Sequence, residues 1–355
     1  GEPGPVLTCD GARFNIQTRD AELAGGVRIQ LPGGAMLATD GGSFAANSRT
    51  FSANSAVTFV SGATFGSAGR ATYDLELDRV VLESGIVLHT ENGARLRAPT
   101  AIYERGASTL NFPQGAEIEL PRARIEAPMM SAVLEAGEGP VRDIEMSGGV
   151  TATSFNLDGS GMGELRAERI AASVDGSGRW QIEAGTGGPW IRARFVGGEG
   201  YLERELTTLV LRGVLGDEGL INLRAESGVC VREVPTEGSI RWAEAETARV
   251  WFADGQATDV ELVQGVLLRG EGIEARGYRA RMSPQAGLTM LHGEPTGRQR
   301  VLLVSERGRL SCDQAQLFNR EGRSEARGNV QGEIRDVSLV GGRDGGTEGP
   351  AHFAS

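Results

Sequence analysis

The chain has 355 residues, of which 53 are glycine and 5% are aromatic, a composition that argues against a compact α/β enzyme. A formal net charge of −11 argues against broad nucleic-acid binding, because contact with phosphates requires a positively charged face. All 36 basic residues are arginine, and no apolar run approaches the ~20 residues of a membrane-spanning helix.

Alternation of apolar and polar residues is the main pattern along the chain. Residues two apart lie on the same face of a strand, so each alternating segment predicts a strand with one buried and one solvent-facing side. In chain order, the apolar positions of these predicted strands are Val27, Ile29 and Leu31; Leu75 and Leu77; Ile118 and Leu120; Ile144 and Met146; Ile191, Ala193 and Phe195; Ile240 and Trp242; Val260 and Leu262. Residues 242–251 are the best candidate for a helix, but Ala, Glu and Trp alternate there as well, so we predict a strand.

A glycine followed directly or closely by Val or Ile recurs along the chain and is predicted to close successive structural units. These glycines are Gly26, Gly85, Gly149, Gly213, Gly265 and Gly328. Their spacing of about 52 to 64 residues is typical of a quasi-one-dimensional β-architecture, in which each unit buries its apolar face on its neighbours. The spacing therefore predicts a repetitive, antiparallel, all-β chain.

The ends of the chain differ in composition from the alternating region. Residues 1–20 and 341–355 are rich in glycine and polar residues, which predicts a flexible N-terminal segment and a disordered C-terminal tail. Between them we predict two β modules, at residues 21–150 and 151–340.

Candidate reactive side chains are few and scattered. The cysteines have neither metal nor redox spacing, and the histidines have no ligand or nucleophile partner at a telling spacing; they are Cys9, Cys230, Cys312, His89, His292 and His352. We therefore predict no catalytic residue, no metal site and no cofactor. Arginine doublets such as Arg95/Arg97 and Arg192/Arg194 place two guanidinium groups on one strand face, which suits phosphate, but the many acidic residues favour a balanced, solvated face.

Two segments resemble the repeat unit of the lipopolysaccharide-transport β-jellyroll family. Residues 71–104 are similar to the repeat of LptC, and residues 308–334 are similar to the unit of LptA and of the OstA-type N-terminal region of LptD. The family's unit has a strand of small residues, a turn, and a second strand that closes on a glycine and a valine. The matching positions are Leu310, Cys312, Ala315, Leu317, Ala326, Gly328 and Val330 in the last copy, and Ala71, Tyr73, Leu75, Leu77, Gly85 and Val87 in the first. Because familiar members are about half this length, the chain looks like two or more fused modules.

The resemblance implies an elongated antiparallel β-jellyroll, or β-taco, with an open apolar groove that holds acyl chains without covalent bonds. It implies a non-catalytic transport or bridge protein in the periplasm of a Gram-negative bacterium, with a removed N-terminal segment as the inner-membrane anchor. The implied partners are lipopolysaccharide or a related glycolipid, other Lpt-type components joined by edge-strand pairing, and an inner-membrane ABC transporter, with no nucleic acid. The residues then expected to line the groove are Val27, Ile29, Leu75, Leu77, Ile118, Leu120, Ile144, Met146, Phe195, Trp242, Val260, Leu262 and Leu310.

The same apolar set has a plainer interpretation, since any sandwich or solenoid would bury such residues as core. Two alternative functions follow. A β-solenoid structural or adhesin-type envelope protein would have a filled core and no bound lipid. A β-helical polysaccharide-processing enzyme would gather carboxylates or arginines on one face of the solenoid.

Overall fold

The structure is a computed structural model that describes residues 5–31, 34–53, 55–62, 64–90, 93–121, 123–135, 140–155, 162–185, 191–198, 201–216, 219–253, 256–284, 286–318, 322–334 and 351–354. Nearly all of these residues lie in antiparallel strands, which confirms the predicted repetitive all-β class. The one helical element in this part of the chain is a 3-10 turn, η1 (Arg105–Ala107). Within the same ranges, no helix is long and apolar enough to cross a membrane.

The chain divides into two compact units. The first consists of Gly1–Leu157 and Arg166–Val174, and the second of Asp158–Leu165 and Asp175–Ser355. The module boundary expected at residue 150 falls inside a strand, β15 (Val141–Phe155). Residues 6–14, in the expected N-terminal segment, form two strands, and of the expected tail only residues 351–354 are described, also as a strand.

The strands of the first unit are β1 (Val6–Thr8), β2 (Gly11–Phe14), β3 (Ala21–Gln30), β4 (Met36–Ala45), β5 (Thr50–Ala53), β6 (Val57–Ser61), β7 (Thr64–Ala68), β8 (Arg70–Asp74), β9 (Arg79–Thr90), β10 (Arg95–Glu104), β11 (Thr109–Phe112), β12 (Ala116–Leu120), β13 (Ala123–Ala127), β14 (Met129–Leu134) and β15 (Val141–Phe155). The next strand, β16 (Met162–Val174), has residues in both units. The strands of the second unit are β17 (Trp180–Gly185), β18 (Ile191–Gly198), β19 (Tyr201–Thr208), β20 (Val210–Gly216), β21 (Gly219–Pro235), β22 (Arg241–Ala253), β23 (Gln256–Gly270), β24 (Ile273–Ser283), β25 (Leu288–His292), β26 (Val301–Ser305), β27 (Gly308–Cys312), β28 (Gln314–Phe318), β29 (Arg323–Arg327), β30 (Gln331–Ile334) and β31 (Ala351–Ala354).

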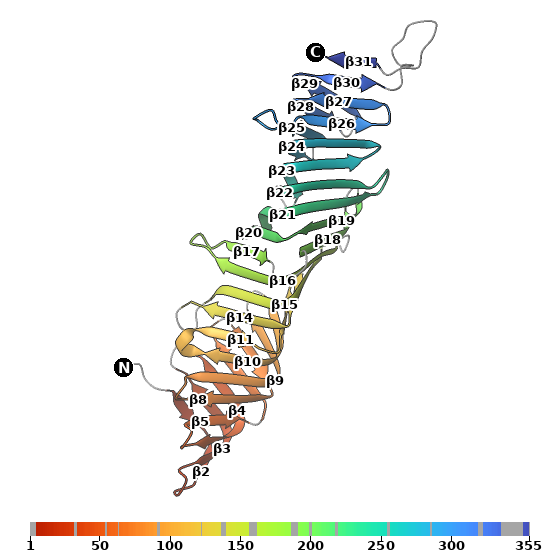
Figure 1. Ribbon diagram of the computed structural model, residues 1–355. Coiled ribbons are helices and arrows are strands. Elements are labelled where there is room, and N and C mark those ends of the chain that lie inside the picture. Colours follow the sequence, from red (N-terminus) through yellow and green to blue (C-terminus); the bar gives the residue numbers. More distant parts are fainter. Residues whose placement is uncertain are drawn as a thin grey trace. The chain divides into compact units, whose positions relative to one another are not determined.

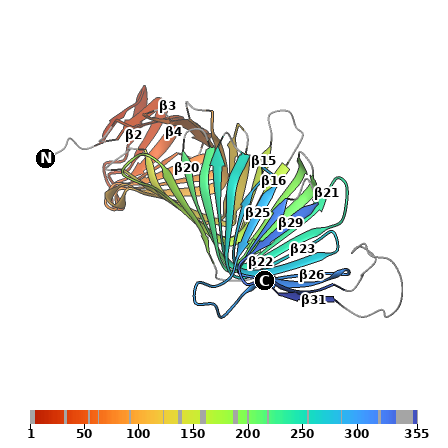
Figure 2. The same cartoon turned by 90° about the horizontal axis from the view of Figure 1, so that it is seen from above.

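Long strands pair with a different short strand along each of their halves, so the sheet of each unit has two arms (Figure 1). In the first unit, β9 lies opposite β8 along residues 79–83 and opposite β7 along residues 87–90. In the second unit, β24 lies opposite β26 along residues 273–276 and opposite β25 along residues 279–283. We call arm A the side that contains β2, β5, β8, β11, β14, β17, β20, β25, β28 and β29, and arm B the side that contains β1, β6, β7, β12, β13, β18, β19, β26, β27, β30 and β31. Figure 2 shows β25 and β29 of arm A diverging from β26 and β31 of arm B in the second unit.

Long strands change arm at a corner, which in β3, β9, β15, β21 and β23 is formed by two consecutive residues with positive φ. At the corner of β9 these are Ser84 and Gly85, with φ values of 68° and 80°, a backbone conformation in which glycine lacks the penalty that other residues pay. The same pair of conformations occurs at residues 25–26, 148–149, 227–228 and 264–265, and the ladder register shifts at several of these points. The β-branched residue that follows each corner is at most 2% exposed: Val27, Ile86, Val150, Val229 and Val266. The repeat therefore places one core residue per corner.

The glycine expected to close a unit at residue 213 is not a corner, and this prediction was wrong. Gly213 lies within β20, opposite Ile182 and Leu223. The corner is at Gly228 instead, where Ser227 also has positive φ. Even spacing favoured Gly213, but the ladder between β17 and β20 runs through Gly213 without a register shift, so the strand does not turn there.

A further copy of the repeat at residues 7–29, which precedes the copy at residues 71–104, shares one register with the last copy. Leu7 lies opposite Ile29 and Gly11 opposite Ala24 in this N-terminal copy; Leu310 lies opposite Gly332 and Gln314 opposite Arg327 in the last. In both copies an aspartate follows a cysteine, and its backbone N–H donates to the carbonyl of a positive-φ glycine: Asp10 to Gly25 at 2.8 Å and Asp313 to Gly328 at 2.9 Å. The repeat seen in the sequence is thus a repeat of backbone pairing.

Candidate functional site: the inner face of the arms

We call the face that carries the buried residues next to the corners the inner face. On β18 the exposed fraction along this face rises from 1% at Ile191 to 6% at Ala193 and 45% at Phe195. On β12, in the first unit, it rises from 8% at Ala116 to 41% at Leu120. The inner face is therefore dry beside the corners, while apolar side chains at the far ends of these strands reach solvent.

Ten of the thirteen residues predicted to line a groove lie on the inner face, at different depths. Four of them are buried: Val27, Ile29, Met146 and Leu262. Four are half-buried: Ile118, Ile144, Val260 and Leu310. Two are exposed at the ends of their strands: Leu120 and Phe195. The inner face thus includes both plain core and accessible apolar surface.

Leu75 and Leu77 lie outside any strand, so the strand predicted from the alternation of residues 74–78 was wrong. Strand β8 ends at Asp74, whose carboxylate accepts the backbone N–H groups of Glu76 and Leu77, each at 3.0 Å. Asp78 has φ of 48° and completes the turn into β9. Aspartate favours such turns because its side chain satisfies nearby backbone donors, and this outweighs the alternation. Leu75 is half-buried in the turn and Leu77 is 59% exposed.

Trp242 lies on the outer face, not on the inner face as the alternation predicted. Its position in β22 is opposite Arg232 and Arg269, whereas Ala243 and Ala245 face inward. The guanidinium carbon of Arg232 is 5.6 Å from the centre of the Trp242 ring, within range of a cation–π contact. The prediction relied on side-chain size and was wrong, because small alanines occupy the inner positions of β22 and the large aromatic residue lies on its outer face.

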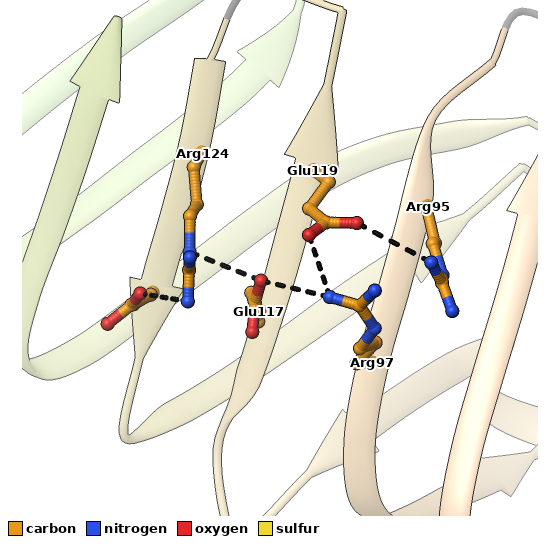
Figure 3. A network of polar contacts seen from close by, with 6 residues as sticks. Arg95, Arg97, Glu117, Glu119 and Arg124 are labelled. Carbon is orange, nitrogen blue, oxygen red and sulfur yellow. Dashed lines mark hydrogen bonds and ion pairs between the residues drawn. The ribbon is translucent and has the colours of Figure 1, made fainter.

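The outer face of arm B in the first unit is a ladder of ion pairs (Figure 3). Arg97 contacts Glu117 at 3.3 Å and Glu119 at 2.7 Å, and Arg124 contacts Glu117 at 3.1 Å. Partial burial raises the pKa of Glu119, but the hydrogen bond from Arg97 and the charges of Arg97 and Arg95 outweigh it, so this pKa lies below its usual range. The arginine doublet here faces carboxylates of neighbouring strands.

The inner face of the second unit carries a chain of charged side chains that the sequence patterns did not single out. Nε of Arg204 in β19 donates to Glu233 in β21 at 2.5 Å, and Glu233 lies 3.5 Å from Arg241 in β22. Arg241 in turn donates to Glu271, in the turn after β23, at 2.5 Å. The alternation of inner and outer residues could have revealed this row of charged side chains, since Glu233 is two residues from Val231 and four from the buried Val229.

One hollow among the described residues is lined partly by titratable side chains. A hollow at the corners of β21, β22 and β23 is lined by Cys230, Glu244, Glu246 and Gln264, among others. Burial and the charge of Glu244 raise the pKa of Cys230, which favours the unreactive thiol. Among the described residues, no three His, Cys, Asp or Glu side chains group as a metal site.

Comparison with known proteins adds no family assignment. No protein-family model matches the chain, and a search of the curated proteins gave no match.

Proposed function

We propose that the chain binds a lipid with several acyl chains and passes it along the inner faces of its two units. The observation that carries the proposal is the exposure gradient on β18, where an apolar face continues from Ile191 in the core to an exposed Phe195. A filled core would end at the buried residues. Each methylene group of an acyl chain that leaves water on such a face contributes about 0.8 kcal/mol, so several short chains would suffice for stable binding.

The most fitting lipid is lipopolysaccharide or a related glycolipid, and the proposed location is the periplasm. The motif resemblance at residues 71–104 and 308–334 supports this choice. Catalysis is not part of the proposal; the energy for directed movement would come from a partner ABC transporter.

Edge strands would supply the contacts to protein partners. Among the described residues, β1 and β2 each pair only with β3, which leaves their other backbone edges open. An open edge presents a row of N–H and C=O groups that another strand can complete. The proposed partners are other Lpt-type components that add a strand there.

Photo-crosslinking at neighbouring residues of one strand tests lipid binding directly. A photoreactive amino acid at Phe195 faces inward, and the same amino acid at Val196 faces outward on the same strand, so the two differ in little but the face. The purified protein, isolated from an envelope-containing host, is irradiated and its adducts are identified by mass spectrometry and solvent extraction. We expect lipid adducts at Phe195 and none at Val196. Equal labelling at both positions, or no lipid at Phe195, would contradict the proposal and favour a structural envelope protein.

A further inference from the structure

The charged chain on the inner face of the second unit comprises Arg204, Glu233, Arg241 and Glu271, and we call it the inner arginine cluster. Its three strand residues lie on the neighbouring strands β19, β21 and β22, and Glu271 joins them from the turn between β23 and β24. Two guanidinium groups therefore share Glu233, whose side chain is 20% exposed, while each arginine is 45% exposed. The cluster combines two cations at one accessible place.

The surroundings of the cluster are apolar. Arg204 lies opposite Phe195 on β18, and Ile273, also an exposed apolar residue, follows Glu271 closely in the chain. Along β18, β19 and β21–β24, the other described residues of arm B that share the inner face are apolar, apart from Thr208 beside the corner. The cluster thus marks the boundary between the apolar face and solvent, which is the place where the head group of an amphiphile would lie.

Both arginines retain hydrogen-bond donors. Among the described residues, Arg204 donates only through Nε, and Arg241 donates only through one terminal nitrogen, to Glu271. The guanidinium carbon of Arg204 lies 3.8 Å from the centre of the Tyr201 ring, so the ring holds the plane of the guanidinium group. Among the described residues, Arg204 is within ion-pair distance of Glu233 alone, and Arg241 is within that distance of Glu233 and Glu271. The donors that these contacts leave unused are the ones that a ligand could take.

We propose that the inner arginine cluster binds the phosphate group of a lipid whose acyl chains lie on the apolar inner face of the second unit. The inference rests on the lipid binding proposed above and adds the chemistry of the head group. A guanidinium group presents a planar fork of donors that matches phosphate oxygens, and a phosphate monoester carries more charge than the half-exposed carboxylate of Glu271, whose ion pair is weak because water screens it. The cluster would then select phosphorylated lipids over neutral ones.

Calorimetric titration with two lipids of equal chain length tests the selection. The probes are dioctanoyl phosphatidate, which carries a phosphate monoester, and dioctanoylglycerol, which does not; both are used below the concentration at which they form micelles. The full chain is compared with the double variant Arg204→Gln/Arg241→Gln and with the outer-face control Arg192→Gln/Arg269→Gln, which removes the same charge. We expect the unaltered chain and the control to bind the phosphatidate at least about tenfold more tightly than the neutral lipid, and the inner variant to lose this preference.

Each outcome separates the inference from the function on which it rests. Equal affinity of the unaltered chain for both probes, or a preference that survives in the inner variant, would overturn the phosphate site and leave lipid binding intact. Binding of neither probe would overturn both. Inorganic phosphate alone is expected to bind far more weakly than the phosphatidate; equal affinity would mean that the site takes free phosphate and would overturn the assignment to a lipid.

Discussion

The charge of single carboxylates on the outer face depends on nearby arginines of the same strand and of neighbouring strands. Glu274 accepts hydrogen bonds from Arg276 at 2.7 Å and Arg269 at 3.0 Å. These hydrogen bonds, from Arg276 first, hold the pKa of Glu274 below its usual range. The pKa of Glu203 is lowered in the same way, chiefly by the hydrogen bond from Arg194. The folded chain therefore binds fewer protons at acidic pH than the unfolded chain does.

This difference predicts acid destabilisation with a definite sign. A lowered pKa contributes stability that is present above the unfolded value of about 4.3 and is lost as the pH falls through the folded value. In the variant Glu274→Gln this contribution is absent, so we expect its melting temperature to fall less than that of the unaltered chain between neutral pH and pH values below about 4. Thermal melts across this range measure it. Glu237→Gln, in an exposed bend and without an ion pair among the described residues, is the control. If the melting temperature of this control falls as little with pH as that of Glu274→Gln, the effect does not come from the lowered pKa of Glu274.

At the scale of the element, the corner is the feature that organises every long strand. In β3, β9, β15, β21 and β23 two consecutive positive-φ residues redirect the strand, and the β-branched residue that follows is buried. A side chain would have room at Gly85, because a Cβ atom there would meet nothing within 4 Å. The requirement for glycine at this corner is therefore conformational and not steric.

The variant Gly85→Ala measures that requirement. Forcing an alanine into the left-handed region costs about 1–2 kcal/mol, so we expect the free energy of unfolding to fall by roughly that amount in urea titrations. Gly106→Ala is a matched control, since its surroundings are equally open and its φ is not positive. A loss of stability at Gly106 as large as that at Gly85 would show that the cost does not come from the corner.

Sequence patterns predicted much of this architecture, and the predictions that were wrong failed for physical reasons. Alternation assigned the inner face of β3, β12, β18 and β23 because those strands have apolar residues on one side and charged residues on the other. It failed at Leu75 and Leu77, where Asp74 caps a turn, and at Trp242, where alanines occupy the inner side. Alternation separates the two faces of a strand but assigns the inner one only where large apolar residues mark it, and it does not report how far a face extends into solvent.

At the scale of the whole molecule, two compact units each carry an inner face with an accessible end, at Leu120 in the first unit and at Phe195 in the second. Because each unit has its own apolar face, we expect the two to load lipid separately. Leu120→Glu places a charge on the first face, and we expect it to reduce photo-crosslinked lipid at Ile118 several-fold while adducts at Phe195 persist. Mass-spectrometric yields at the two positions measure this effect. Loss of adducts at both positions would mean that the units do not bind lipid independently.

The position of each corner also sets the length of the strand segment that a bound acyl chain would contact. After its corner, β9 continues from Ile86 to Thr90, whereas β21 continues from Val229 to Pro235. At about 3.3 Å per residue, these segments extend for roughly 16 and 23 Å. Because side chains alternate with a period of two, a pair of residues added beyond a corner lengthens this segment without exchanging its inner and outer faces. The acyl-chain length that each unit accommodates can therefore change in steps of two residues, while the corner and the buried β-branched residue that follows it stay as they are.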